Sequence, residues 1–233
     1  MAGGHGSCVS RVPIFGSLSG EQQAVVAGYA RATRLGREQQ LYGPGDRVGR
    51  LFVVHTGRVK VLRVASNGAE ALVRTAGPGD VVGELAFVTG ERPDHRVVAM
   101  DAVSLCVFDH RDLAAILAAY PGVVMRMLQA VTRRLEAAEA RLASMSSVDV
   151  TGRLAEYLLS LPIAVDSLGA RDGRTRVRLP MAKKDLASFL GTTPESVSRA
   201  LRRMTDDAVI TAGRGPVLVI NDPDALERLA QPA

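Results

Sequence analysis

Cysteine and tryptophan are scarce in this sequence of 233 residues, which has two cysteines, Cys8 and Cys106, and no tryptophan. Two cysteines exclude a disulfide framework, and they cannot supply a zinc or iron–sulfur site that takes four thiolates from one chain. Long apolar runs are also missing, because residues 113–128, the most apolar segment, are interrupted by Pro121, Gly122 and Arg126. Residues 1–10 lack the basic start and the apolar stretch of a signal peptide. We therefore expect a cytoplasmic protein without a membrane partner.

Positive charge is concentrated in one part of the chain. The formal net charge is +5 and the pI about 9.7, which alone is weak support for a polyanionic partner. Residues 171–203, however, contain nine Lys or Arg against three Asp or Glu, whereas residues 204–233 contain two against five. A phosphate-facing surface requires such a local excess of positive charge, so this distribution indicates nucleic-acid binding near residues 171–203.

The first half of the sequence has the texture of an antiparallel β-domain. Residues 13–34 are predicted as short helices. Between residues 41 and 108, short runs of apolar, often β-branched residues alternate with Gly, Asn and Pro turns at a spacing of roughly 8–12 residues. Asn67-Gly68 is a strong hairpin signal because both residues tolerate positive φ. We predict an α+β fold in which residues 1–120 form a jelly-roll-like antiparallel β-roll.

One long helix is predicted over residues 123–145. Its apolar residues recur every seven positions and form a narrow seam with charged residues on both sides, which is typical of a two-helix coiled coil. The alternative is a helix packed on its own β-domain. We assign residues 121–148 to a homodimerisation helix and a hinge near Ser146–Asp149. The seam consists of Val124, Leu128, Val131, Leu135, Ala138, Leu142 and Met145.

Residues 149–233 are predicted to form a winged helix-turn-helix domain. Asp149 is a plausible N-cap for a helix over residues 150–161. Residues 183–190 and 194–204 form two further short helices, separated by Gly191 and by a hydroxyl cap with Pro194 in the first turn. Two helices joined by a tight turn, the second with a polar and basic face, are the helix-turn-helix design. Residues 209–211 and 217–220 add a β-hairpin wing.

Three segments resemble the CRP/FNR family of bacterial transcription regulators. The run KKDLASFLGTTPESVSRALRRMTDDAVI is similar to that family's helix-turn-helix, and GPGDVVGELAFVTG is similar to its β-roll. The run RRLEAAEARLASMSSVDVTGRLAEYLLSL resembles its dimer helix and hinge. The resemblance covers nearly the whole chain, and the helix-turn-helix portion is the most specific. It implies a homodimeric regulator that binds double-stranded DNA, and contacts RNA polymerase if it acts as an activator.

The second helix of this motif carries the candidate base-reading residues. Glu195 can accept a hydrogen bond from cytosine N4, Arg199 can bind guanine O6 and N7 as a fork, and Ser198 lets the backbone approach a thymine. Glu-x-x-Ser-Arg resembles the FNR-type reader of TTGAT half-sites, which implies an inverted repeat with a TTGA-like core. The candidate phosphate contacts, which position the helix without specifying sequence, are Lys183, Thr193, Arg202 and Arg203.

The candidate effector pocket of the β-roll lacks features of a cyclic-nucleotide site. The resemblance places Gly83, Glu84 and Leu85 where cyclic-nucleotide binders of the family have the same three residues. The Arg-Ser pair that grips the cyclic phosphate in those proteins is missing, although Arg92 and Arg96 flank the place. Ala138 also lacks the hydroxyl that contacts adenine in the cyclic-AMP receptor. We therefore do not expect cyclic AMP, which remains the alternative.

Other cofactors and an enzymatic role are also not expected. Two cysteines cannot hold the four-cysteine iron–sulfur cluster of FNR, and no haem-attachment motif is present. His55, His95 and His110 are scattered and lack the His-x-His pairing of a cupin-like metal enzyme, which is the rival reading. Cys8 is a candidate redox thiol with an incidental free thiol as the alternative, and Cys106, in an apolar run, is expected in the core.

Overall fold

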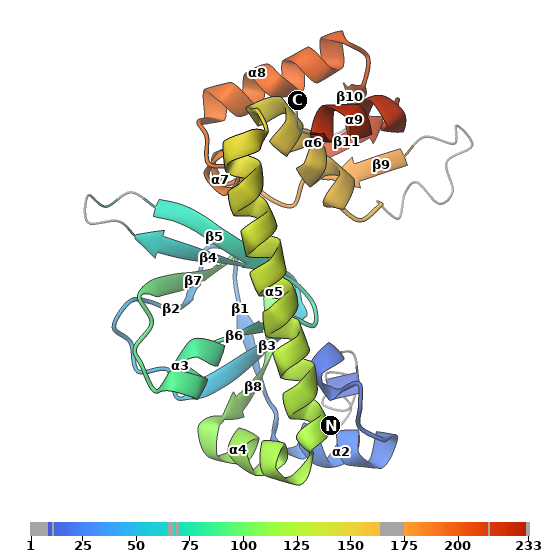
Figure 1. Ribbon diagram of the computed structural model, residues 1–233. Coiled ribbons are helices and arrows are strands. Elements are labelled where there is room, and N and C mark those ends of the chain that lie inside the picture. Colours follow the sequence, from blue (N-terminus) through green and yellow to red (C-terminus); the bar gives the residue numbers. More distant parts are fainter. Residues whose placement is uncertain are drawn as a thin grey trace. The chain divides into compact units, whose positions relative to one another are not determined.

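The computed structural model describes residues 9–10, 12–64, 68, 70–163, 175–213 and 215–231 (Figure 1). The chain divides into two compact units, Met1–Leu135 and Glu136–Ala233. The division falls within the longest helix of the described residues, α5 (Pro121–Ser147).

The described part of the first unit contains two antiparallel four-stranded sheets, and this confirms the predicted β-roll (Figure 1). The β4–β5 hairpin pairs Val64 with Glu70 around the turn predicted from Asn67-Gly68, of which Asn67 lies outside the described residues. One sheet has the order β1 (Arg31–Leu35), β8 (Val103–Asp109), β3 (Arg50–Thr56) and β6 (Val81–Val82). The other has the order β2 (Gln40–Tyr42), β7 (His95–Ala99), β4 (Val59–Val64) and β5 (Glu70–Ala76).

Strand β3 is apolar on both faces because it separates two core clusters. Successive side chains of a strand point to opposite faces. Leu51 and Val53 lie in the cluster that β3 shares with the N-terminal segment and α4 (His110–Ala119). Phe52 and Val54 lie in the cluster between the two sheets. This double burial explains why the run from Leu51 to Val54 is continuously hydrophobic rather than alternating.

The N-terminal helical segment is shorter than the sequence indicated. It contains η1 (Pro13–Phe15) and α2 (Gly20–Tyr29), the latter begun by a capping box between Ser19 and Gln22. The expectation that short helices extend to Arg34 was wrong. Residues Arg31–Leu35 instead form strand β1, because they pair with β8 at the edge of the first sheet.

Helix α5 begins at Pro121, directly after α4, and the chain bends by 109° between them. In the first unit, Val123 is fully buried and Met127 packs partly buried against the core cluster of α4 and the N-terminal segment. Within the described residues, no helix taken singly has the length and apolar composition needed to cross a membrane. The bent pair of α4 and α5 reaches them only together.

The second unit has the predicted winged helix-turn-helix composition. A three-stranded sheet of order β10-β11-β9 packs with helices α6 to α9. Helix α9 was not expected from the sequence, although Asp222 caps it and Pro223 occupies its first turn. The elements are α6 (Val150–Ser160), β9 (Thr175–Arg178), α7 (Lys183–Phe189), α8 (Pro194–Asp206), β10 (Ile210–Ala212), β11 (Val217–Ile220) and α9 (Pro223–Ala230).

Candidate nucleic-acid interface and effector pocket

Helices α7 and α8 form the helix-turn-helix. Leu186 and Ala187 of α7 are almost completely buried, and they hold it against the rest of the unit. Gly191, in the turn, has a φ of +64°, a left-handed conformation that glycine adopts without steric cost. The Thr193 side chain then accepts a hydrogen bond from the Ser196 backbone N–H at 3.2 Å and caps α8.

The exposed face of α8 presents the candidate base-reading residues. Val197, Ala200 and Met204 are buried on the opposite face. Glu195, Ser198 and Arg199 are exposed, and their spacing places them on one face of the helix. The Arg199 Nη2 donates to Ser196 Oγ at 3.1 Å, a contact that uses one of the five guanidinium N–H donors.

The candidate phosphate contacts lie around this face. Lys183 is exposed at the first residue of α7, and Thr193 is the N-cap of α8, where backbone N–H groups favour an anion. Arg202 is 85% exposed and lies 4.0 Å from Asp206, one turn further along α8. Arg203 is exposed beside it. These four groups add three positive charges to the helix-turn-helix surface.

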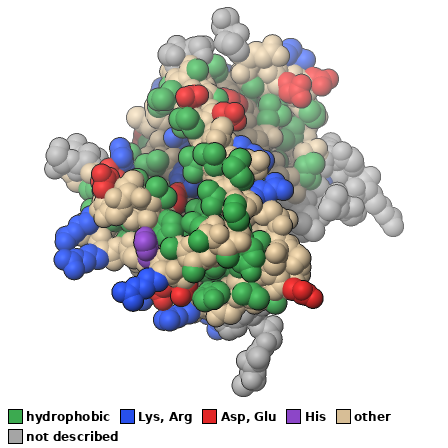
Figure 2. Space-filling model, turned by 60° about the horizontal axis from the view of Figure 1, so that its bottom comes forward, with side chains coloured by type: hydrophobic (Ala, Val, Ile, Leu, Met, Phe, Trp, Pro, Cys, Tyr) green, Lys and Arg blue, Asp and Glu red, His purple; other side chains and the backbone are tan. Residues whose placement is uncertain are grey.

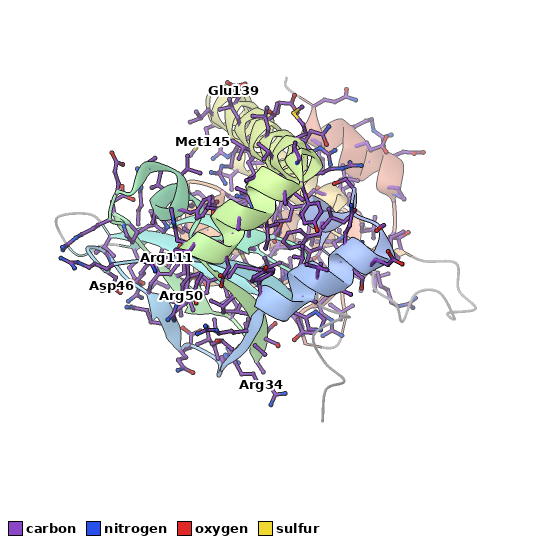
Figure 3. The ribbon with its side chains drawn as sticks, turned by 90° about the horizontal axis from the view of Figure 1, so that it is seen from below. Arg34, Asp46, Arg50, Arg111, Glu139 and Met145 are labelled. Atoms are coloured by element: carbon purple, nitrogen blue, oxygen red, sulfur yellow. The ribbon has the colours of Figure 1, made fainter. Side chains whose placement is uncertain are left out.

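The apolar seam of α5 is exposed in the single chain. Leu128, Leu135 and Leu142 have 56%, 57% and 67% of their surface accessible, values unusual for leucines. Val124, Val131 and Met145 are also exposed, whereas Ala138 is half-buried. Hydrophobic side chains gather in the middle of the face drawn in Figure 2, and Met145 and Glu139 project from α5 in Figure 3.

A cavity of about 280 Å³ opens in the β-roll. Gly83, Glu84 and Leu85 line it, as the sequence indicated. Arg92 and Arg96 do not belong to its lining. Arg92 donates to the Gly45 carbonyl at 3.2 Å, and Arg96 forms an ion pair with Glu70. Neither guanidinium therefore stands in for the missing phosphate-gripping arginine.

Two other arginines, Arg74 and Arg134, contact Glu84, a role that the sequence did not indicate for them. Arg74 lines the cavity, and Arg134 does not. The Arg74 Nη2 donates to Glu84 Oε1 at 3.0 Å, and Arg134 of α5 donates to the same oxygen. Burial lowers the pKa of Arg74, and the negative charge of Glu84 opposes that effect. The spacing of residues could have indicated that both arginines point inward. Arg74 lies two residues before the buried Ala76, on the same face of the strand, and Arg134 lies seven residues after the partly buried Met127, on the same face of the helix.

A chain of polar contacts lines the same cavity. The Asp94 carboxylate is 2.7 Å from Arg63 Nη2 and 3.2 Å from His95 Nδ1, and His95 Nε2 is 3.3 Å from the Tyr42 hydroxyl. The hydrogen bond from His95 and the charge of Arg63 lower the pKa of Asp94. Burial, with the nearby charge of Glu84, raises the pKa of Tyr42. The cavity thus holds an ionised carboxylate with its charge already paired.

The structure describes one of the two cysteines. The candidate redox thiol, Cys8, lies outside the described residues. Cys106 is buried in β8, which confirms its place in the core.

Comparison with known proteins covers both units. A family model described as a Crp-like helix-turn-helix domain matches residues 152–229, and one described as a cyclic nucleotide-binding domain matches residues 32–120. The probable transcriptional regulator flp of Lacticaseibacillus casei is 30% identical over 218 residues, which cover 94% of this chain and 96% of that protein. A CRP-like cAMP-activated global transcriptional regulator of Mycobacterium tuberculosis is 28% identical over 227 residues, 96% of this chain and 98% of that protein.

The solved structures agree on the fold. The structure of FixK2 from Bradyrhizobium japonicum superposes with a TM-score of 0.74 at 22% identity, and the match covers 88% of this chain and 98% of that one. A CooA mutant from Carboxydothermus hydrogenoformans gives 0.74 at 20% identity, with 89% and 90% covered. With its helix-turn-helix, its β-roll and a relative matched over almost its full length, the chain belongs to the CRP/FNR family of DNA-binding transcription regulators.

Proposed function

We propose that two copies of this chain bind one DNA site, an inverted repeat with a TTGA-like core, and read it through helix α8. The observation that carries this proposal is the exposed face of α8, on which Glu195, Ser198 and Arg199 lie together. Recognition helices of this motif insert such a face into the major groove.

Each of the three residues has a distinct partner in the groove. The Arg199 guanidinium binds O6 and N7 of a guanine, and the Glu195 carboxylate accepts from N4 of a cytosine. Ser198 has too short a side chain to hold the helix away, so a thymine can lie close to the backbone. Lys183, Thr193, Arg202 and Arg203 contact the phosphates on either side and set the register of the helix on the duplex.

The homodimer forms through α5. The seam exposes six large apolar side chains on a helix that also exposes charged residues, including Arg133, Glu136 and Glu139, and one further large apolar side chain, Met125. A second copy of the same helix would cover both seams, and the resulting two-fold axis matches the symmetry of an inverted repeat. Half-sites about one helical turn apart would place both α8 helices in successive major grooves on one side of the duplex.

The experiment that tests this function is a selection of bound sequences from random DNA. The wild-type protein should enrich an inverted repeat with the TTGA-like core. Arg199→Ala should lose about 1–3 kcal/mol of preference at the guanine position and keep its binding to unrelated DNA. Arg228→Ala, which removes an exposed arginine from α9 of the same unit, is the charge-matched control and should select the same sequence. Undiminished preference in Arg199→Ala would show that the readout is wrong.

A phosphate contact should behave differently from a base contact. Arg202→Ala should weaken binding to all sequences by a similar factor. It should also reduce the slope of the logarithm of affinity against the logarithm of salt concentration by about 1, because one fewer counterion is released. A change in sequence preference in Arg202→Ala would instead assign that arginine to base reading.

The effector that controls this regulator is not a cyclic nucleotide in our proposal, although the mycobacterial relative is described as cAMP-activated. Asp94 presents an ionised carboxylate to the cavity, and its arginine partner, Arg63, is already engaged. A phosphodiester there would meet a like charge, which disfavours binding. Calorimetric titration with cyclic AMP should show no heat of binding, and micromolar affinity would refute this part of the proposal.

Two further aspects of control belong to the same proposal. Cys8 is a candidate redox thiol, and sequence selection with and without a reducing agent tests whether oxidation changes DNA binding. Contact with RNA polymerase would follow if the regulator acts as an activator, and transcription with purified polymerase from a promoter that carries the selected site measures it.

A further inference from the structure

Arg153, in the first turn and a half of α6, joins two helix ends through one side chain. Its Nη1 donates to the Val148 carbonyl at 2.7 Å and to the Met145 carbonyl at 3.4 Å. Its Nε donates to the Leu190 carbonyl at 3.1 Å. Met145 belongs to the last turn of α5, and Leu190 is the C-cap of α7, the residue before the turn of the helix-turn-helix.

The chemistry of these acceptors explains why an arginine occupies this position. The last carbonyls of a helix have no partner within the helix, and the helix dipole gives them extra negative charge. A guanidinium carries donors on opposite edges of one rigid plane, so it can serve two helix ends at once. Lysine keeps the charge but concentrates its donors on one nitrogen, which cannot lie at both ends.

Three further contacts hold the end of α5 within the DNA-binding unit, one to α6 and two to α7 and the turn that follows it. The Ser144 hydroxyl, in a buried residue, donates to Glu156 Oε2 of α6 at 3.1 Å. The Arg141 guanidinium lies 4.8 Å from the ring centre of Phe189 at the end of α7. The Met145 methyl group occupies the space that a Cβ of Gly191 would need.

We propose that Arg153 is a positioning residue for DNA reading: it fixes the helix-turn-helix turn to the end of the dimerisation helix and so sets the half-site spacing. The argument rests on the proposed function, since spacing has meaning only for a dimer on a repeat. The last two turns of α5, from Arg141, then move with α7 and α8 as one body. Met145, at once a seam residue and a neighbour of Gly191, links the packing of the dimer to the reader.

The test compares Arg153→Lys with wild type on a series of inverted repeats whose central spacer is shortened or lengthened by one and two base pairs. The wild type should prefer one spacer, because each added base pair rotates one half-site by roughly a tenth of a turn relative to the other. In Arg153→Lys this preference should fall about tenfold, the factor that corresponds to one lost hydrogen bond from a charged group. The base preference within each half-site should stay as in wild type.

Two matched controls separate positioning from general destabilisation. Arg228→Lys makes the same substitution on α9 and should keep the spacer preference. Gly191→Ala places a Cβ against Met145 and should also flatten the preference, whereas Gly215→Ala meets a similar positive φ with open space around it and should not. If Gly191→Ala fails to fold, Met145→Ala tests the same contact without backbone strain, at protein concentrations above the dimer dissociation constant.

Amide hydrogen exchange of residues 186–193 gives a readout that needs no DNA. Faster exchange in Arg153→Lys than in wild type, together with a flattened spacer preference, supports the proposal. An unchanged spacer preference in Arg153→Lys overturns it. If the wild type itself does not prefer an inverted repeat to a single half-site, the proposed dimeric function fails. Unchanged hydrogen exchange in Arg153→Lys would in that case overturn the positioning role separately.

Discussion

Leu135→Ala should weaken the dimer without unfolding the chain. Burying a leucine completely contributes about 1.5–3 kcal/mol. Leu135 is 57% exposed in the single chain, so its coverage by a partner helix is worth about 1–1.5 kcal/mol. Each dimer contains two copies of the substituted residue, and alanine keeps one of the four side-chain carbons of leucine, so about three quarters of this contribution is lost at each copy. The expected loss is therefore about 2 kcal/mol per dimer, or roughly a 30-fold increase in the dissociation constant.

Sedimentation equilibrium over a range of protein concentrations measures this constant directly. Leu159→Ala is the matched control, because it makes the same substitution at an exposed leucine of α6, 39% accessible and outside the seam. Circular dichroism should show the same helix content in both variants and in wild type. Equal dissociation constants for Leu135→Ala and Leu159→Ala would refute the assignment of the seam, and α5 would then have to bury its apolar side chains in another way.

Three further outcomes are expected. Glu84→Gln should lower the free energy of unfolding by about 1–2 kcal/mol in chemical denaturation, because Arg74 and Arg134 both lose the carboxylate that they share in a partly exposed site. Thr193→Ala should lower it by about 1 kcal/mol through the lost α8 cap, with serine at this position restoring it. Asp94 has a lowered pKa through His95, so it stabilises the fold at neutral pH and loses that effect as the pH falls through the folded pKa. In Asp94→Asn, stability should therefore decline slightly less steeply on acidification, and an identical pH profile would contradict this.

Periodicity was enough to predict the architecture from the sequence, but not the direction of every polar side chain. The heptad of α5 and the paired helices of the DNA-binding unit follow from residue spacing alone, and so does the glycine turn at Gly191. Arg92 and Arg96 were placed in the effector pocket because they lie close to it in the sequence. In the structure Arg96 faces Glu70 across the sheet, a partner that depends on strand register. Register is a long-range property, so local pattern could not supply it.

The missed residues share a physical cause as well. The sequence pattern placed Arg134 in the charged border of the predicted coiled coil and gave no role to Arg153. Each in fact satisfies acceptors on elements distant in the chain, Glu84 and Val81 in one case and the Leu190 carbonyl in the other. A sequence shows which donors exist, but only the packed structure shows which buried acceptors need them.

Two arginines of α5, Arg134 and Arg141, lie on either side of the division between the two units, so α5 is the element through which a signal from the effector cavity would have to pass. Arg134 ties the helix to the effector cavity, and Arg141, seven residues later, begins the stretch held to α7. At 1.5 Å per residue the two are about 10 Å apart along the helix, and the seam residues Leu135 and Ala138 lie between them. An effector can shift the dimer only if it binds one arrangement more tightly than the other. A ligand that binds Glu84 in place of Arg134 would meet this condition if one dimer arrangement kept the contact between Glu84 and Arg134 and the other did not.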